Sequence, residues 1–213
     1  MRNAKIIVVE DDAFTRTTLT ESLNHTGLKV VASVGTAREA IAAQIEFSPE
    51  AAVLDLDLGT GPTGIDVAHA FRARNPEIGI IILTSFRDAR LANPNLPALP
   101  AGSIFLNKRE LESIQALAIQ ISVVLVNPLS RRAMPWNKKN AYGSLSNTQI
   151  EIMKSIADGY TTSEIAKQRG VSEQAIEKTI SRICANLEIP KSADKNQRVQ
   201  IVRAFFYGAG REI

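Results

Sequence analysis

Residues 51–58 read Ala-Ala-Val-Leu-Asp-Leu-Asp-Leu. Four apolar residues are followed by two acidic residues, Asp55 and Asp57, that alternate with leucines. An apolar run of this length is typical of a strand that is covered on both faces in a parallel sheet. In an open parallel sheet, ligand-binding and reacting groups gather at the carboxyl ends of the strands. The stretch therefore predicts both the sheet and the edge at which its chemistry takes place.

The rest of the N-terminal half repeats this unit of strand and helix. Helical spacing of apolar residues spans 14–25, 37–47 and 65–74, and Thr36 and Gly64 mark expected helix starts. Strands that alternate with helices in this way are joined by right-handed crossovers and pair in parallel. We therefore expect a doubly wound α/β domain with a five-stranded parallel sheet. Its expected strands are residues 5–9, 28–34, 51–56, 78–83 and 103–106.

Charged or hydroxyl-bearing side chains follow four of the five expected strands, so the fold would bring them to one edge of the sheet. Clustered carboxylates repel each other, and a hard divalent cation that takes oxygen ligands, such as Mg²⁺, relieves that repulsion. A carboxylate beside such a cation, a lysine and a hydroxyl can act as a nucleophile toward phosphorus. The residues concerned are Glu10, Asp11 and Asp12 after the first strand, Asp55 and Asp57 after the third, Thr84 and Ser85 after the fourth, and Lys108 after the last.

Residues 3–126 resemble the receiver domain of two-component response regulators. The matching segments are Ile6-Ile-Val-Val-Glu-Asp-Asp12, Val53-Leu-Asp-Leu-Asp-Leu58, Ile81-Ile-Leu-Thr-Ser85 and Phe105-Leu-Asn-Lys108, in the family's order. The resemblance implies a flavodoxin-like fold in which a histidine kinase phosphorylates Asp55 with Mg²⁺. It also implies metal ligation by Glu10, Asp11, Asp55 and the backbone carbonyl of Asp57, phosphoryl contacts from Thr84 and Lys108, and a switch in which Thr84 and Phe105 reorient.

Other polar side chains of this half are not expected to act in the site, and the two histidines lie alone on expected helices with no partner at ligand spacing. For Asp12, the side chain of Asp57, His25 and His69 we expect local structural roles.

The sequence departs from the receiver pattern after the fourth strand. Pro94, Pro97 and Pro100 fall where the family has its fourth helix, and a proline inside a helix costs about 3 kcal/mol. We expect that helix to be short, displaced or absent. The following helix, residues 109–126, lacks charges after Glu112, which indicates burial at a subunit or domain contact.

Two other enzyme classes share parts of the pattern after the third strand. Residues 59–64 spell G-x-G-x-x-G, the outline of a dinucleotide-binding loop, but Asp55 and Asp57 would repel a pyrophosphate there. Asp55-Leu-Asp57 is similar to the nucleophile motif of haloacid-dehalogenase phosphatases. Those enzymes carry that motif on their first strand and their acidic metal pair late in the chain, whereas here the acidic pair comes first.

The C-terminal half is basic and helical. Residues 127–213 hold 14 basic against 8 acidic residues, a balance that suits contact with nucleic-acid phosphates. Residues 127–142 mix prolines and basic residues without an apolar period, as interdomain linkers do. Capping residues Ser146, Thr161 and Ser172 then open three expected helices, and Pro190 precedes a fourth at about 196–207.

A short helix, a glycine turn and a longer helix form the outline of a helix-turn-helix. Residues 144–190 resemble the LuxR-type DNA-binding domain of NarL/FixJ-class regulators, through Ile156-Ala-Asp-Gly159, Glu164-Ile-Ala166 and Val171-Ser172 among other segments. Glu177 and Thr179 replace a lysine and a histidine usual in that family, which leaves the DNA sequence preference open. Cations suit phosphates, and amides or hydroxyls can read bases. The expected DNA-binding residues are Gln174, Lys178, Ser181, Arg182, Lys191 and Lys195.

Composition narrows the class of protein further. The single cysteine, Cys184, excludes an internal disulfide framework and fits a reducing cytoplasm. The longest weakly polar stretch is shorter than the roughly 20 residues of a membrane span. We expect a cytoplasmic receiver domain (1–126), a linker (127–143) and a helix-turn-helix domain (144–213).

The combined resemblance implies a transcription factor rather than an enzyme. Its expected partners are a sensor histidine kinase, double-stranded promoter DNA and a second copy of the chain, with no membrane. The alternative is a phosphorylation-independent regulator whose receiver serves only for protein interaction or dimerisation.

Overall fold

The computed structural model describes residues 3–129, 141–192 and 194–211. Its contacts divide into two compact units. The first holds a five-stranded sheet and helices α1–α4, and the second holds residues 86–96 together with helices α5–α8. The expected domain limits at 126 and 144 therefore leave out one feature, which is that residues 86–96 pack with the helices of the second unit.

The sheet of the first unit is entirely parallel, with strand order β2-β1-β3-β4-β5. This confirms the doubly wound fold class. The expected strands are correct to within one or two residues at each end. The observed bounds are β1 Lys5–Val9, β2 Lys29–Val34, β3 Ala51–Leu54, β4 Gly79–Thr84 and β5 Ile104–Asn107.

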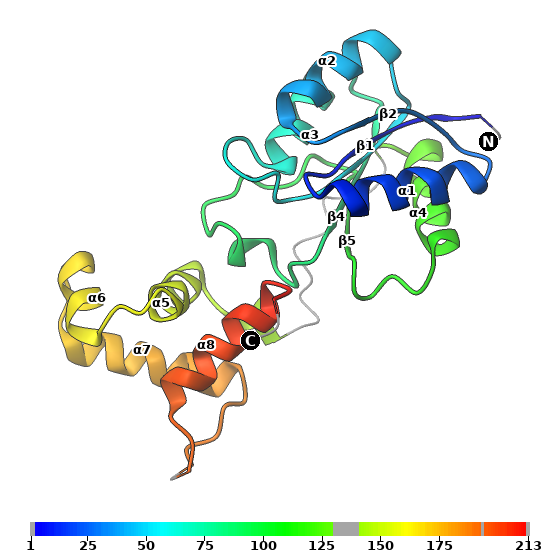
Figure 1. Cartoon of the computed structure of the whole chain (residues 1–213). Helices are drawn as coiled ribbons and strands as arrows, with labels where there is room; N and C mark the ends of the chain where they lie inside the picture. Colours follow the sequence, from blue (N-terminus) through cyan, green and yellow to red (C-terminus); the bar gives the residue numbers. More distant parts are fainter. Residues whose placement is uncertain (1–2, 130–140, 193, 212–213) are drawn as a thin grey trace. The chain divides into compact units, whose positions relative to one another are not determined.

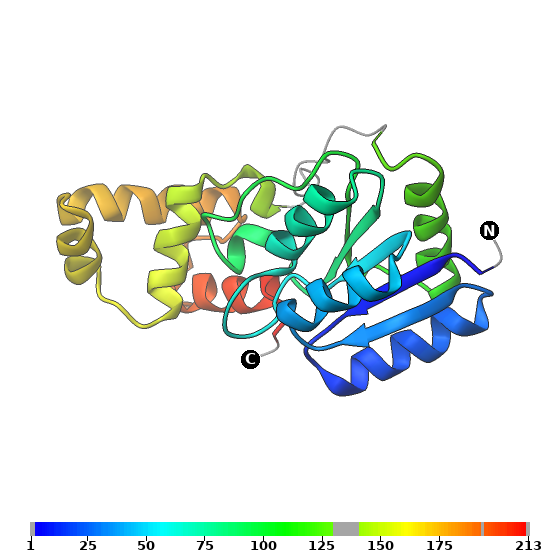
Figure 2. The ribbon, with the colours of Figure 1, turned by 90° about the horizontal axis from the view of Figure 1, so that it is seen from above.

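Helices cover both faces of this sheet (Figures 1 and 2). Helices α2 (Ala37–Phe47) and α3 (Gly64–Arg74) pack on one face, and α1 (Ala13–His25) and α4 (Ile114–Val126) pack on the other. Every residue of β3 and β4 is buried as a result. The double covering explains why these strands are apolar throughout instead of alternating with polar residues.

Polar caps fix the start of helix α3. Thr63 accepts a hydrogen bond from the backbone N–H of Asp66, and the Asp66 carboxylate accepts from the backbone N–H of Thr63. This reciprocal capping box, with Thr63 as the N-cap, starts the helix at Gly64, where a helix start was expected. A Cβ on Gly64 would lie 1.9 Å from the backbone oxygen of Asp55. Only glycine allows helix α3 to begin this close to the end of β3.

The proline-rich segment contains no α-helix. Only a 3-10 turn, η1 (Ala89–Leu91), forms there, which confirms that the family's fourth helix is absent. Helix α4 begins at Ile114, five residues later than expected, because Ser113 caps it by accepting from Ala116 N–H. Helix α4 buries residues including Ile121 against the sheet and leaves Ile119 exposed. Its expected contact with another subunit or domain stays a prediction.

The second unit contains four α-helices among the described residues, and they confirm the expected order. The expected linker, residues 127–143, falls largely on residues 130–140, which lie outside the described residues. No helix in the described part of the chain is long and apolar enough to span a membrane. The elements are η2 Ala141–Ser144, α5 Asn147–Ala157, α6 Thr162–Arg169, α7 Glu173–Asn186 and α8 Gln197–Gly208.

The close approach at Gly64 leads to a stability prediction. We expect Gly64→Ala to lower the free energy of unfolding of the first unit by more than Thr63→Ala. The second change removes only a helix cap and costs about 1 kcal/mol, whereas the first sets a methyl group against a backbone oxygen. Denaturant unfolding followed by circular dichroism measures both variants. Equal stability of the two variants would contradict the close approach.

Candidate functional site

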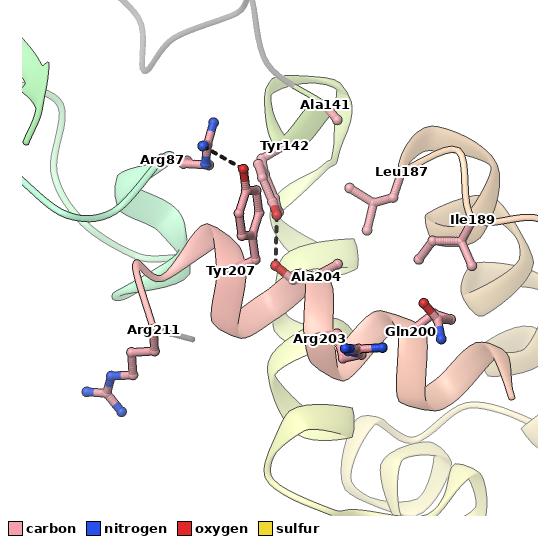
Figure 3. Close-up of a pocket in the computed structure, with 10 residues that line it drawn as sticks. All are labelled: Arg87, Ala141, Tyr142, Leu187, Ile189, Gln200, Arg203, Ala204, Tyr207 and Arg211. Carbon is pink, nitrogen blue, oxygen red and sulfur yellow. Dashed lines mark hydrogen bonds between the residues drawn. The ribbon is translucent and has the colours of Figure 1, made fainter. Parts of the chain in front are cut away.

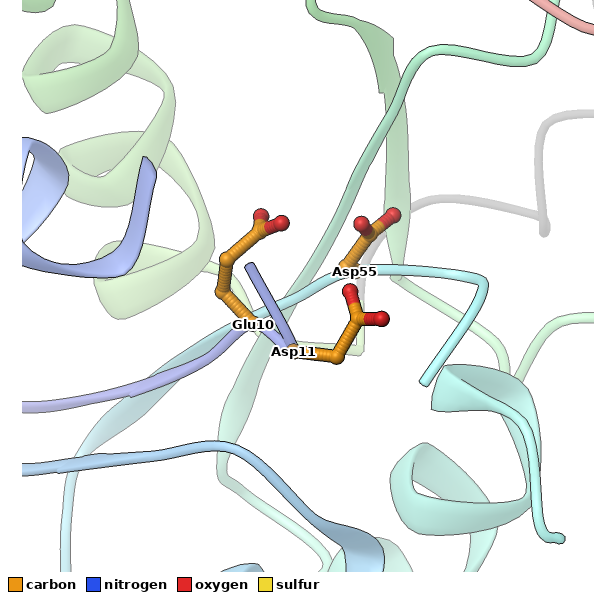
Figure 4. A group of neighbouring side chains, drawn as sticks. All are labelled: Glu10, Asp11 and Asp55. Atoms are coloured by element: carbon orange, nitrogen blue, oxygen red, sulfur yellow. The ribbon is translucent and has the colours of Figure 1, made fainter. Parts of the chain in front are cut away.

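Three carboxylates meet at the carboxyl edge of the sheet. Glu10 and Asp11 directly follow β1, and Asp55 directly follows β3, the strand that pairs with β1. One carboxylate oxygen from each residue lies within 4.8 Å of those of the other two. Figure 4 shows the side chains of Glu10, Asp11 and Asp55 projecting into the same space. The expected convergence of these residues is therefore observed.

The ammonium group of Lys108 lies between two of the carboxylates. Lys108 follows β5, and its Nζ donates to Glu10 Oε2 at 2.6 Å and to Asp55 Oδ2 at 2.9 Å. The side chain of Glu10 is 4% exposed and that of Asp55 is 10% exposed. Residues 98 positions apart in the chain thus form one nearly buried ionic cluster.

Burial and like charge shift the protonation of this cluster. Burial, followed by the nearby charge of Asp55, raises the pKa of Glu10 from 4.5 to about 7, although Lys108 opposes the shift. Burial alone would lower the pKa of Lys108, but the charges and hydrogen bonds of Asp55 and Glu10 together raise it. Lys108 therefore stays protonated, and Glu10 tends to hold its proton up to about neutral pH.

The cluster has the composition of a site for a hard divalent cation. Its ligand atoms are all carboxylate oxygens, which Mg²⁺ prefers. Three carboxylates lie close together here, and the ammonium group of Lys108 bridges only Glu10 and Asp55, which leaves an excess of negative charge. A divalent cation would supply the missing charge, so the residues present fit Mg²⁺. The proposed fourth ligand, the backbone carbonyl of Asp57, stays a prediction.

Two further expected residues lie on the neighbouring strands. Thr84 ends β4 and is completely buried. Its backbone carbonyl accepts from the N–H of Lys108 at 2.8 Å, which ties the ends of β4 and β5 together beside the carboxylates. Phe105 lies within β5 and is half-buried. Their expected reorientation during switching stays a prediction.

Arg16 is a positioning residue that the sequence analysis did not identify. Its Nη1 donates to the backbone carbonyl of Glu10 at 2.6 Å and to that of Asp11 at 3.1 Å. The guanidinium therefore holds the loop that carries the acidic pair. An arginine on the first turn of the following helix, five residues after the pair, is the signal that could have predicted this contact.

The residues expected to have local roles do have them. Asp12 caps helix α1 by accepting from Thr15 N–H at 2.8 Å, and Asp57 accepts from Gly59 N–H at 3.2 Å within its turn. The rings of His25 and His69 hydrogen-bond to the backbone carbonyls of Glu21 and Ala98.

The glycines of the loop after β3 have backbone explanations. Gly59 and Gly61 adopt φ angles of +79° and +125°, which favour glycine. Gly64 is required by its approach to Asp55. The G-x-G-x-x-G spacing therefore follows from the path of this loop and gives no support to a dinucleotide site.

Helices α6 and α7 of the second unit form the expected helix-turn-helix. Helix α6 ends at Gly170, which adopts a left-handed conformation with φ 64°, and Ser172 caps α7. Helix α7 buries Ile176 and Ile183 in the core of the unit, with Ile180 and Leu187 packed beside them. The expected core stripe is confirmed.

The expected DNA-binding residues are all exposed. On helix α7 they lie opposite the core stripe, at positions that share one face at 100° per residue. The Ser181 hydroxyl donates to the backbone carbonyl of Glu177 at 3.0 Å, so only its oxygen lone pairs can meet DNA. These residues are Gln174, Lys178, Ser181 and Arg182 on α7, with Lys191 and Lys195 after it.

Arg198 on helix α8 has a structural role instead of an exposed surface position. Its guanidinium donates to the hydroxyl of Thr162 at 3.0 Å and to the backbone carbonyl of Tyr160. It thereby fixes the start of helix α6 against helix α8.

Models of two protein families match the two halves of the chain. Residues 6–109 match the response regulator receiver domain, and residues 143–200 match the LuxR family of bacterial regulatory proteins. The oxygen regulatory protein NreC of Staphylococcus epidermidis is 26% identical over 199 residues, which cover 87% of this chain and 91% of NreC. The NreC protein of Staphylococcus aureus strain MRSA252 is also 26% identical, over 86% of this chain and 90% of its own length.

Solved structures of whole regulators share the fold. RcsB from Salmonella enterica serovar Typhimurium, bound to the promoter rprA with a beryllofluoride phosphomimetic, has a TM-score of 0.54 at 18% identity, covering 95% of this chain and 98% of RcsB. A structure of two RcsB dimers bound to two parallel DNAs has a TM-score of 0.52 at 18% identity, covering 94% and 97%. At this identity the likeness concerns the fold.

The raised pKa of Glu10 predicts how Mg²⁺ affinity depends on pH. Between its ordinary pKa of 4.5 and about 7, Glu10 keeps its proton in the folded protein, and a bound cation must displace it. We therefore expect Mg²⁺ affinity to rise about tenfold per pH unit below pH 7 and to level off above it. Isothermal titration between pH 5.5 and 8.5 measures this dependence.

A matched pair of variants serves as the control. Glu10→Gln has no proton to displace, so its affinity should be lower and nearly independent of pH. Glu21→Gln, on the exposed surface of α1, should behave as the wild type. A Glu10→Gln variant that kept the full pH dependence would overturn the assignment to Glu10.

Proposed function

Because this chain belongs to the response regulators that join a receiver domain to a LuxR-type DNA-binding domain, we propose that phosphorylation of Asp55 by a sensor histidine kinase controls its binding to promoter DNA. The observation that carries the proposal is the bridge from Lys108 Nζ to Asp55 and Glu10. The bridge holds the Asp55 carboxylate beside the ammonium group of Lys108. Asp55 matches the position at which the family accepts phosphate.

The chemistry assigned to these residues is phosphoryl transfer. A carboxylate oxygen of Asp55 attacks the phosphorus of the kinase's phosphohistidine, a P–O bond forms, and the P–N bond breaks as the imidazole leaves. Lys108 and the Thr84 hydroxyl meet the phosphoryl oxygens. Mg²⁺, held by Glu10, Asp11, Asp55 and the carbonyl of Asp57, would supply further positive charge.

The modification changes the charge at the edge of the sheet. A phosphoryl group carries about −1.5 to −2 charges at neutral pH, in a place where Lys108 already bridges two carboxylates. The Lys108 bridge must rearrange to meet it. We expect Thr84 and Phe105 to reorient in response, since both lie on the strands β4 and β5 next to the site.

DNA recognition is assigned to the exposed face of helix α7. Lys178, Arg182, Lys191 and Lys195 would contact phosphates, and Gln174 and Ser181 would lie closest to bases. We propose that two copies of the chain bind two half-sites about one helical turn apart. The RcsB dimers solved on DNA, which share the fold, support this arrangement.

The remaining features of the proposal follow from this role. The receiver domain is assigned to residues 1–126, the linker to 127–143 and the DNA-binding domain to 144–213. The protein would act in the cytoplasm, as its single cysteine suggests, and as a transcription factor instead of an enzyme. A receiver that never accepts phosphate and serves only for dimerisation is the alternative.

Two acidic residues two positions apart allow a direct test of the phosphorylation site. With acetyl phosphate and Mg²⁺, we expect mass spectrometry to show one phosphoryl group on the wild type and on Asp57→Asn, and none on Asp55→Asn. Asp57 serves as the control because its side chain is exposed and only accepts from Gly59 N–H. No uptake by the intact wild type would favour the phosphorylation-independent alternative.

A second test concerns the DNA-binding face. We expect Lys178→Ala and Arg182→Ala each to weaken binding to DNA. Each should also reduce the slope of log affinity against log salt concentration by about one, as the loss of a phosphate contact does. Lys29→Ala, which changes an exposed lysine of β2, should leave the DNA affinity and its salt dependence unchanged. Fluorescence anisotropy with a duplex selected by the wild type from fragmented genomic DNA measures the affinities. An unaltered salt dependence in both α7 variants would place the DNA elsewhere.

A further inference from the structure

The segment that follows β4 belongs to the second unit. Residues 86–96, here called the strap, leave the sheet two residues after Thr84 and pack with helices α5–α8, and the chain returns to the first unit at residue 97. The strap is thus part of the helical unit although the receiver sequence surrounds it on both sides.

Apolar side chains of the strap complete the core of the helical unit. Leu91 is 2% exposed and lies in the same cluster as Tyr142 and Phe205, and Phe86 packs against that cluster. The packing is tight at Gly208, because a Cβ there would lie 2.6 Å from Leu91 Cδ1 and 2.7 Å from Tyr142 Cζ. Removing Leu91 would therefore open a cavity inside the DNA-binding unit.

A buried ion pair anchors the strap near the start of helix α5. Asp88 is completely buried, and its carboxylate accepts from Arg90 Nη2 at 2.7 Å and from Arg90 Nε at 3.0 Å. The same guanidinium donates to the backbone carbonyls of Tyr142 at 2.9 Å and Leu145 at 2.7 Å. One planar group thus connects a buried carboxylate of the strap to two carbonyls just before α5, a pattern that lysine cannot reproduce.

The strap also contacts the end of helix α8. The backbone N–H of Arg87 donates to the carbonyl of Gly208 at 2.8 Å. The Arg87 guanidinium donates to the Tyr207 hydroxyl at 2.9 Å and lies 4.5 Å from the centre of that ring (Figure 3). At the other end of the strap, Asn147 Nδ2 donates to the carbonyl of Pro94 at 3.2 Å. The strap is therefore attached to both α5 and α8.

We propose that the strap transmits the state of Asp55 to the DNA-binding helix. This inference rests on the proposed function. Thr84 lies beside the phosphorylation site and is joined to Arg87 by only two residues, so a shift of Thr84 changes the position of a segment that is attached to α5 and α8. Because α5 packs against α7, a change in the strap reaches the helix assigned to DNA.

The coupling has a thermodynamic consequence in both directions. If the strap connects the two sites, beryllofluoride changes DNA affinity and DNA changes beryllofluoride affinity by the same factor, typically about 5- to 150-fold. Loosening the strap should bring both factors toward one, which means that the two sites are no longer coupled. Asp55 should still accept phosphate, since the strap side chains lie outside the carboxylate cluster.

The experiment uses full-length protein and two substitutions in the strap. Arg90→Lys keeps a cation beside Asp88 but loses the forked contact to both carbonyls, and Leu91→Ala opens the cavity. We expect both variants to raise hydrogen exchange in α5 and α8, to leave exchange in β1–β4 unchanged, and to reduce the beryllofluoride effect on DNA affinity to less than half of the wild-type factor.

Two matched variants serve as controls. Leu91→Met keeps the volume, and Glu151→Gln breaks the ion pair with Arg169 elsewhere in the same unit, where Nη1 and Oε2 lie 2.8 Å apart. Both should respond to beryllofluoride as the wild type does. If Glu151→Gln reduced the response as much as Arg90→Lys, general destabilisation would replace the strap as the explanation.

The outcomes separate this inference from the proposed function. If Asp55 takes up phosphate and beryllofluoride changes DNA affinity equally in the wild type, Arg90→Lys and Leu91→Ala, then transmission through the strap is overturned. The proposed function is not affected by that result. Unchanged exchange in α5 and α8 in both variants overturns its place in the helical unit. Absence of phosphoryl uptake by the wild type overturns the proposed function, and transmission with it, while the exchange measurements still decide where the strap packs.

Discussion

A single ammonium group, that of Lys108, holds two nearly buried carboxylates together, and the receiver unit is arranged around that constraint. Charges removed from water require partners of opposite sign, so the strands that carry Glu10, Asp55 and Lys108 must end at one edge. Parallel pairing of β1 with β3, β3 with β4 and β4 with β5 brings about this arrangement. Asp11 adds a third carboxylate, which leaves the cluster with an excess of negative charge. Burial, together with the nearby charge of Asp55, keeps Glu10 partly protonated near neutral pH.

The parts of the fold that local chemistry decides could be predicted from the sequence. Continuous apolar runs predicted the buried strands because two layers of helices cover the sheet. Thr36 was expected to mark the start of α2, and it is the N-cap of that helix. The site could be predicted for a different reason. Parallel strands place their carboxyl ends together, so residues after three strands had to meet whatever the details of packing. Asp12 and the side chain of Asp57 were separated from the cluster correctly because their spacing suits helix and turn caps.

Contacts between distant segments could not be predicted in this way. Proline spacing after β4 predicted a short, displaced or absent helix but carried no information on where the segment would pack. In the sequence, Leu91 and Arg90 resemble any apolar and basic residue of a loop. The apolar period does not specify the contact of Arg16 with the acidic loop, and only the spacing of this arginine after the acidic pair could have indicated it. The late start of α4 came from Ser113, since one side-chain cap decides where a helix begins when the residues before it are polar.

The absent helix and the strap have a common physical origin. Pro94, Pro97 and Pro100 disfavour a regular helix, and the segment after β4 instead forms bends and the 3-10 turn η1. Such a segment can contribute side chains to the core of another unit, and here it contributes Leu91 and the buried pair of Asp88 with Arg90. The buried pair makes the arrangement selective, because Asp88 in any apolar environment without Arg90 would be an uncompensated charge. The chain after β4 thereby leads from Thr84 directly into the core of the helical unit.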